Sequence, residues 1–98
     1  MKLKSKQKAY LKSLGQTMDV VVKVGDRGVS TNVIASANEA LVARELIKVS
    51  ITSPDRNYRK EAIAELARET ESMIVNTIGK TALLFKVNPE NPTVSKKL

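Results

Sequence analysis

The apolar residues of this 98-residue chain recur with two different spacings, which predict helices and strands in alternation. Apolar positions three and four apart are typical of amphipathic helices, whereas short apolar runs or alternation are typical of strands. The helical spacing covers residues 5–14, 30–44 and 58–71. The strand patterns cover residues 20–24, 46–52, 73–78 and 81–87. The predicted order is therefore α-β-α-β-α-β-β.

Residues at the ends of these segments support the predicted boundaries. Gly15 follows the first helical pattern, and glycine is favoured in the position just after a helix. Ser30 and Thr31 are candidate caps for the second helix, and Asp55 or Asn57 for the third. Residues 79–80, a glycine followed by a lysine, predict a two-residue hairpin turn between the last two strands.

The order of elements predicts one α/β domain with a four-stranded mixed sheet packed against helices. A strand–helix–strand unit normally joins parallel strands by a right-handed crossover, and the final hairpin is antiparallel. The sequence contains no internal repeat and no sign of a second domain. We expect the domain to span residues 1–87, with residues 88–98 forming a flexible, unfolded tail, because that segment is polar and contains two prolines.

A glycine-containing loop, Gly25-Asp26-Arg27-Gly28, lies between the valine-rich strand and the second helix. Glycine adopts positive φ readily and lets a backbone approach another molecule closely. The amides that begin the following helix are unpaired donors at its positive end, which suits a phosphate. A GxxG loop is also how KH domains clamp an RNA backbone. The alternative is an ordinary turn from strand to helix, and the loop alone leaves both interpretations open.

The charge of the chain favours a polyanionic partner. Seventeen basic residues against ten acidic ones give a net charge of +7. Residues 1–28 hold seven of the bases and two of the acids, so most of the excess lies in the first third. Such asymmetry suits nucleic acid or an anionic membrane surface, and a soluble, mildly basic surface with no particular partner explains the charge equally well. No apolar stretch approaches the roughly 18 residues of a membrane span, and the lysine-rich start lacks the apolar region of a secretory signal.

Charged stripes distinguish the first and third predicted helices. Lys4, Lys8 and Lys12 are spaced by four, which places like charges on one face at a small cost in stability. That face could present lysines to phosphates or could simply be solvated. The third helix carries an acidic stripe that would repel RNA, so we expect it on the side facing away from RNA: Glu61, Glu65 and Glu69.

Residue types that are missing from the chain limit its chemistry. The sequence has no histidine and no cysteine, which excludes the commonest zinc sites, thiol nucleophiles and Ser-His triads. The glycine loop lacks the spacing and the Lys-Ser/Thr pair of a nucleotide-binding P-loop. We therefore expect no enzymatic activity, no metal, no cofactor and no small-molecule substrate. The lack of cysteine also fits a cytoplasmic protein.

Three stretches, in this order and spacing, resemble the CRM-domain family, named for chloroplast RNA splicing and ribosome maturation. They are residues 24–28, residues 39–49 and the pair of segments 78–80 and 84–86. The likeness is to free-standing bacterial members. It implies a fold similar to the carboxy-terminal domain of translation initiation factor three, no catalysis, and binding to structured RNA in precursors of the large ribosomal subunit. Residues 25–28 would contact RNA backbone.

The chain departs from the family pattern at two places. Asp26 stands where the family often has lysine, and it lowers the local positive potential. Phe85 and Lys86 stand where tyrosine and arginine are usual, so a hydroxyl and a bidentate guanidinium are missing. These changes would weaken contacts without changing the class of partner.

The sequence thus predicts a monomeric RNA-binding protein, with ribosomal RNA as the expected partner. The alternative is a protein-docking module whose basic face binds an acidic partner. For any single cation outside the loop, an ordinary solvated surface charge explains its presence equally well. The candidate RNA-binding residues are Lys4, Lys8, Lys12, Lys23, Gly25, Asp26, Arg27, Gly28, Arg44, Lys48, Lys80 and Lys86.

Overall fold

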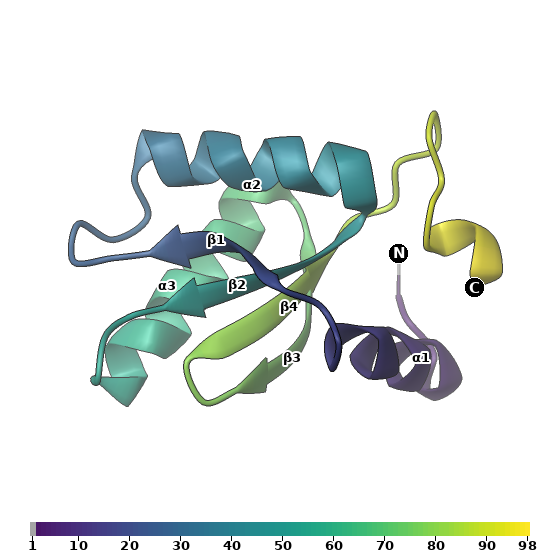
Figure 1. Cartoon of the computed structure of the whole chain (residues 1–98). Coiled ribbons are helices and arrows are strands. Elements are labelled where there is room, and N and C mark those ends of the chain that lie inside the picture. The colour runs from purple at the N-terminus through teal and green to yellow at the C-terminus, as the bar shows by residue number, and fades with distance from the viewer. Residues whose placement is uncertain (1) are drawn as a thin grey trace.

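A computed structural model describes residues 2–98 and contains the predicted order of elements (Figure 1). The helices are α1 (Ser5–Gly15), α2 (Thr31–Arg44) and α3 (Arg56–Thr70). The strands are β1 (Val20–Val24), β2 (Leu46–Ile51), β3 (Met73–Ile78) and β4 (Thr81–Phe85). A short 3-10 helix, η1 (Ser95–Lys97), follows near the carboxyl end.

Side-chain caps set where the two long helices begin. The Ser30 hydroxyl accepts a hydrogen bond of 3.2 Å from the Val33 amide and starts α2 as predicted. The Asp55 carboxylate accepts hydrogen bonds from the amides of Asn57 and Tyr58, at 2.9 and 3.3 Å. Asp55 is thus the cap of α3, which begins two residues earlier than the apolar pattern indicated.

The end of α1 differs from the prediction. Gly15 is the last residue of the helix rather than a capping residue beyond it, and it is buried. A Cβ atom at this position would lie 2.3 Å from Cδ1 of Leu83 on β4. Glycine is therefore required here for close packing between α1 and the sheet, a reason that the residue pattern of the helix itself does not contain.

The sheet has the strand order β1-β2-β4-β3. β1 and β2 are parallel, and β4 is antiparallel to both of its neighbours. The predicted hairpin is confirmed, with Gly79 at φ +57° as a glycine-first turn requires. Because β4 lies between β2 and β3, the strands joined by α3 run in the same direction without touching. Periodicity along the chain contains no information on this insertion.

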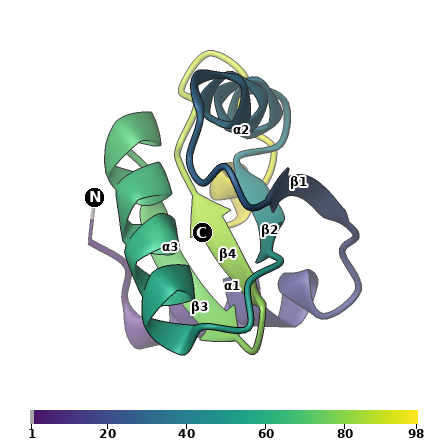
Figure 2. The same ribbon diagram turned by 90° about the vertical axis from the view of Figure 1, so that its left-hand side faces the viewer.

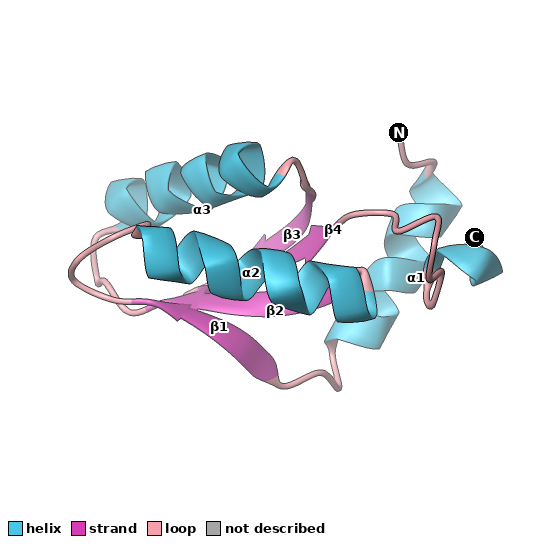
Figure 3. Cartoon of the chain, turned by 90° about the horizontal axis from the view of Figure 1, so that it is seen from above, coloured by secondary structure: helices cyan, strands magenta, loops and turns pink. Residues whose placement is uncertain are grey.

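Helices cover both faces of the sheet, confirming a mixed sheet packed against helices. On one face α2 lies over β1 and β2, while α3 lies over β2 and β3 (Figures 2 and 3). Inward side chains of the strands, such as Val24, Ile47 and Leu84, form the main core with these helices. On the other face α1 packs together with Val94 and Leu98 of the carboxyl-terminal segment, and Leu11 and Phe85 belong to that smaller core.

Residues 88–98 fold back onto the domain, whereas the sequence predicted an unfolded tail. The reason is Glu45, the fully buried residue that directly follows α2. Its carboxylate accepts six hydrogen bonds, from the amide of Asn88 and from amides or hydroxyls of Thr93, Val94 and Ser95. These partners lie 43–50 residues further along the chain, so local composition could not indicate them.

Candidate nucleic-acid interface

The glycine loop is a closed β-turn. The Gly28 amide donates to the carbonyl oxygen of Gly25 at 3.0 Å, and the side chains of Asp26 and Arg27 are exposed at the tip. Gly28 has φ +73°, a conformation that L-residues rarely adopt, whereas Gly25 does not have positive φ. A Cβ atom at Gly25 would meet nothing within 4 Å. The fold of the turn therefore requires glycine at position 28 but not at position 25.

The geometry of the turn determines which backbone amides are available to a ligand. The Gly28 amide is already engaged within the turn. Among residues 2–98, the amides of Asp26 and Arg27 have no acceptor. The amides of Thr31 and Asn32 begin α2 and lack an intrahelical acceptor by geometry. Donors are thus available at the tip of the turn and at the start of the helix behind it.

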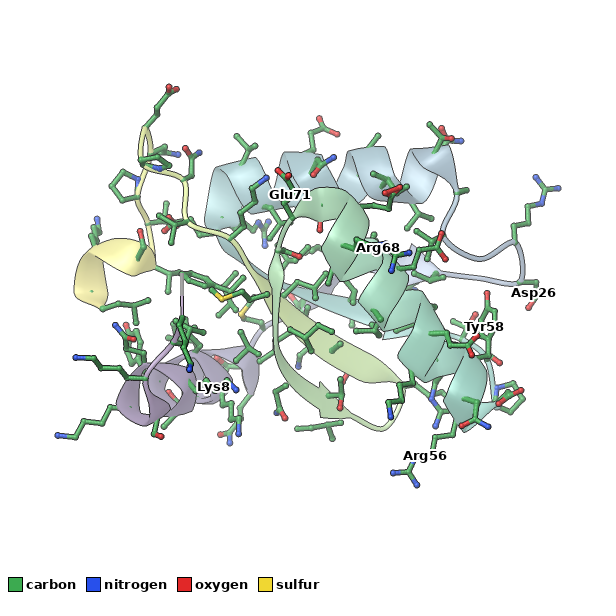
Figure 4. All side chains as sticks on the ribbon, turned by 180° about the vertical axis from the view of Figure 1, so that it is seen from behind. Lys8, Asp26, Arg56, Tyr58, Arg68 and Glu71 are labelled. Atoms are coloured by element: carbon green, nitrogen blue, oxygen red, sulfur yellow. The ribbon has the colours of Figure 1, made fainter. Side chains whose placement is uncertain are left out.

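The first turn of α3 supports the loop from below. The Tyr58 hydroxyl donates a hydrogen bond of 3.3 Å to the carbonyl oxygen of Gly25. The same hydroxyl oxygen lies 3.2 Å from the place that a Cβ atom on Gly28 would take. Figure 4 shows Tyr58 beneath the loop that carries Asp26. The phenol thus fixes the position of the glycine turn on α3.

The β3–β4 turn lies at the same end of the sheet as the glycine loop. Val24 of β1 pairs with Ile51 of β2, so these parallel strands end together. The Ile51 amide also donates to the carbonyl oxygen of Lys80 at 2.8 Å. We call this end of the molecule the loop end; it comprises residues 25–28, 55–60 and 79–80 (Figure 2).

A second group of predicted residues shares the sheet face that α1 only partly covers, named here the open face. Lys23 pairs with Ser50 and is exposed, and Lys48 on the neighbouring strand is half-buried. Both point away from the main core, because Val22, Val24 and Val49 beside them point into it. Lys12 from the last turn of α1 lines a hollow of about 240 Å³ together with Lys48. Three predicted lysines therefore lie on one face.

Four other predicted residues lie away from the loop end. Arg44 ends α2, whose 14 residues span about 21 Å from the loop end. The Lys86 ammonium donates to the carbonyl oxygen of Thr70 at 3.0 Å and so caps the last turn of α3. Lys4 and Lys8 are exposed on α1, and Figure 4 places Lys8 at the opposite end from Asp26. The structure does not bring these four residues to the loop.

Sequence analysis missed three cations at the loop end. Arg56, Arg59 and Lys60 lie in the first turns of α3, beside the residue that supports the loop. The Arg59 guanidinium donates to the carbonyl oxygen of Ser53 at 2.8 Å, which fixes its orientation. They directly precede the acidic stripe of α3, which dominates the charge pattern of this helix. Their clustering directly after the Asp55 cap was the available signal.

Comparison with known proteins agrees with this architecture. Residues 3–86 match the model of the CRS1 / YhbY (CRM) domain. The chain belongs to this family. The CRM relatives include the probable RNA-binding protein YqeI of Bacillus subtilis, 37% identical over 94% of this chain and 96% of its own length. An RNA-binding protein of Haemophilus influenzae is 36% identical over 90% of this chain and 89% of its own.

A solved structure of a relative has the same CRM fold. It is the solution structure of a hypothetical Staphylococcus aureus protein presented as an RNA-binding candidate. The TM-score is 0.79 with 33% identity, covering 92% of this chain and 94% of the other. The family and the α/β fold expected from the sequence are therefore confirmed.

Neither a membrane-spanning helix nor a metal-binding cluster is present in residues 2–98. No helix in this range has the length and apolar character needed to cross a bilayer. No group of three or more side chains suited to a metal ion lies together within the same residues.

Proposed function

We propose that this CRM protein is a non-enzymatic RNA-binding protein that grips structured RNA by its phosphates, with the glycine loop as the clamp. The observation that carries this proposal is the Tyr58-supported turn, whose exposed tip presents Arg27 and free amides. The names of its relatives, which describe RNA-binding proteins, support the same partner.

Phosphate would be held by two kinds of donor at the clamp. The amides at the tip and at the start of α2 face outward at the positive end of a helix dipole. The Arg27 guanidinium adds a charge-assisted bond, which is about twice as strong as a neutral one. Asp26 acts against these donors by repelling the same phosphate. The net attraction therefore depends on the balance between two neighbouring side chains.

Lysines of the open face would extend the contact beyond the clamp. Lys23 leads directly into the loop, and Lys48 and Lys12 continue the positive surface toward α1. Lys4 and Lys8 could engage a longer RNA at the far end of α1. In this arrangement the acidic residues of α3 lie off the RNA path.

We further propose that the RNA is a structured segment of a large-ribosomal-subunit precursor and that the protein acts as a cytoplasmic monomer in subunit assembly. The resemblance to free-standing bacterial CRM proteins supports this finer assignment. Sequencing of RNA crosslinked to the protein in cells would identify the segment. Recovery of messenger RNA without ribosomal RNA would contradict the assignment to ribosome assembly.

Salt titration tests the mode of binding. Neutralising roughly four to six phosphates gives a slope of about −3 to −5 when log K is plotted against log salt concentration. The measurement uses a structured fragment of large-subunit ribosomal RNA and the intact protein. A slope near zero with retained affinity would contradict phosphate-dominated binding. ATP and GTP should show no turnover in a parallel assay, because the phosphate-loop lysine is absent.

A further inference from the structure

A groove of about 870 Å³ separates the first turns of α3 from the β3–β4 hairpin. Apolar side chains form part of its walls, among them Ile63 on the helix and Ile74 on the strand. Arg56, Arg59 and Lys60 also line it, and no acidic side chain is among its lining residues. A hollow of this size falls within the range of small-ligand sites. It combines apolar walls with a cationic rim.

Local sequence explains why the groove is open. Ala64 on α3 and Gly79 in the hairpin turn are small, so little side-chain volume fills the gap. β3 also has a bulge, since its register shifts between Ile74 and Asn76. The bulge leaves both Ile74 and Thr77 lining the groove. Ile74 consequently stays 39% exposed, which is unusual for a large apolar side chain on a strand facing a helix.

We propose that this groove receives one unpaired nucleotide of the bound RNA, an inference that rests on the proposed function. The base lies against the Ile63 and Ile74 walls, and Arg56 and Lys60 hold its phosphate. Proteins hold unpaired bases by stacking them on aromatic side chains or on planar guanidinium groups, and the second kind of support is present here. The Arg59 guanidinium suits stacking, because its bond to the Ser53 carbonyl oxygen already fixes its plane.

The groove is close enough to the clamp to share one RNA. Tyr58 donates to the Gly25 carbonyl oxygen from the same helical turn that carries Arg56 and Arg59 (Figure 4). An RNA strand leaving the glycine loop therefore passes the rim of the groove. The cationic rim attracts any anionic chain, but the apolar part of the walls fits a planar base beside a phosphate and so favours nucleic acid over an acidic peptide.

The test compares a blunt RNA duplex with the same duplex carrying one unpaired uridine. The intact protein should bind the RNA with the unpaired uridine about tenfold more tightly, near the lower end of what stacking one base on an aromatic side chain contributes. Ile74→Ser removes an apolar wall without changing charge and should abolish this preference. The double variant Arg56→Gln/Lys60→Gln, which removes two exposed rim cations, should also abolish the preference for the unpaired uridine. The control Lys96→Gln/Lys97→Gln makes the same charge change on η1 and should retain that preference.

The outcomes separate this inference from the proposed function. Equal affinity of the parent for the two RNAs, or preference retained in both groove variants, would overturn the groove while leaving RNA binding intact. Failure of the parent to bind either RNA would overturn the proposed function itself. A 4-thiouridine placed at the unpaired position should crosslink to a peptide within residues 56–64 or 74–79. Crosslinking only elsewhere would refute the assignment.

Discussion

The hydroxyl of Tyr58 donates to the carbonyl oxygen of Gly25, which also accepts the amide of Gly28. One oxygen atom thus closes the glycine turn and joins it to α3. Tyr58 follows Gly25 by 33 residues, so the loop is held by a distant part of the chain. A turn fixed in this way loses less conformational entropy when it meets a ligand than a free loop would.

Tyr58→Phe removes only the donor of this bond. Because the bond is exposed, we expect the free energy of unfolding to fall by about 0.5 kcal/mol, with a decrease in Tm of roughly 2–4 °C. RNA affinity should also fall, by about threefold, because the glycine loop becomes more mobile and loses more conformational entropy on binding. Tyr10→Phe in α1 is the matched control. Unchanged RNA affinity in Tyr58→Phe would contradict a supporting role for the phenol.

The stability of the protein should depend on the ionisation of Glu45. Burial alone would raise the pKa of this carboxyl, but hydrogen bonds from Ser95, Asn88 and Thr93 outweigh it and lower the pKa from 4.5 to about 2. The folded state therefore binds fewer protons than the unfolded state between these values. The stabilisation, roughly 3 kcal/mol, is complete above pH 4.5 and is lost as the pH falls toward 2.

Unfolding of the parent and of Glu45→Gln between pH 7 and pH 2 measures this contribution. The variant should be less stable at pH 7, since an amide leaves several buried donors unsatisfied, and the difference should shrink on acidification. Glu39→Gln removes an exposed carboxylate from the same helix and serves as control. A constant difference between parent and Glu45→Gln across this pH range would refute the assignment.

Much of the fold follows from local patterns, and the exceptions share one physical cause. Apolar spacing predicted each α-helix and strand, because each of these elements buries one face, but it did not predict η1. Gly15, Glu45 and the strand order escaped prediction since each depends on a contact distant in sequence: Gly15 with Leu83, Glu45 with residues 88–95, and β4 with two separate strands. Residues 88–98 are polar, yet a buried carboxylate orders them.

In the candidate site, too, local patterns predicted some features, and contacts distant in sequence determine the others. The glycine motif itself located the loop, and alternation in residues 46–52 indicated that Lys48 faces away from the core, but only the pairing of β1 with β2 places Lys23 on the same face. Position along the chain could not show that Lys86 caps α3 rather than facing solvent. Nor could it bring Arg56 to the loop end, because that proximity arises from the parallel pairing of β1 and β2 and the short connection to α3.

The two central residues of the loop should act in opposite directions on RNA. Arg27→Ala should weaken binding by about 1 kcal/mol or more through loss of a charge-assisted bond. Asp26→Lys should tighten binding, because it replaces a repelling charge with an attracting one. Both side chains are exposed, so melting temperatures should be nearly unchanged. The control is Arg68→Ala, which removes the same charge further along α3. Equal losses of RNA affinity in Arg27→Ala and Arg68→Ala would show that only the net charge of the protein matters.

The most direct measurement of the central claim is the RNA affinity of Gly25→Ala beside its melting temperature. An added methyl at Gly25 meets no atom of the protein, and φ is not positive there, so stability should be unchanged or slightly raised. Gly28→Ala, at φ +73° and 3.2 Å from the Tyr58 oxygen, should instead lower stability by about 1–2 kcal/mol. If the loop clamps RNA backbone, Gly25→Ala loses about fivefold or more in affinity while its melting curve matches the parent. Parental affinity in Gly25→Ala would show that the loop is only a turn from strand to helix.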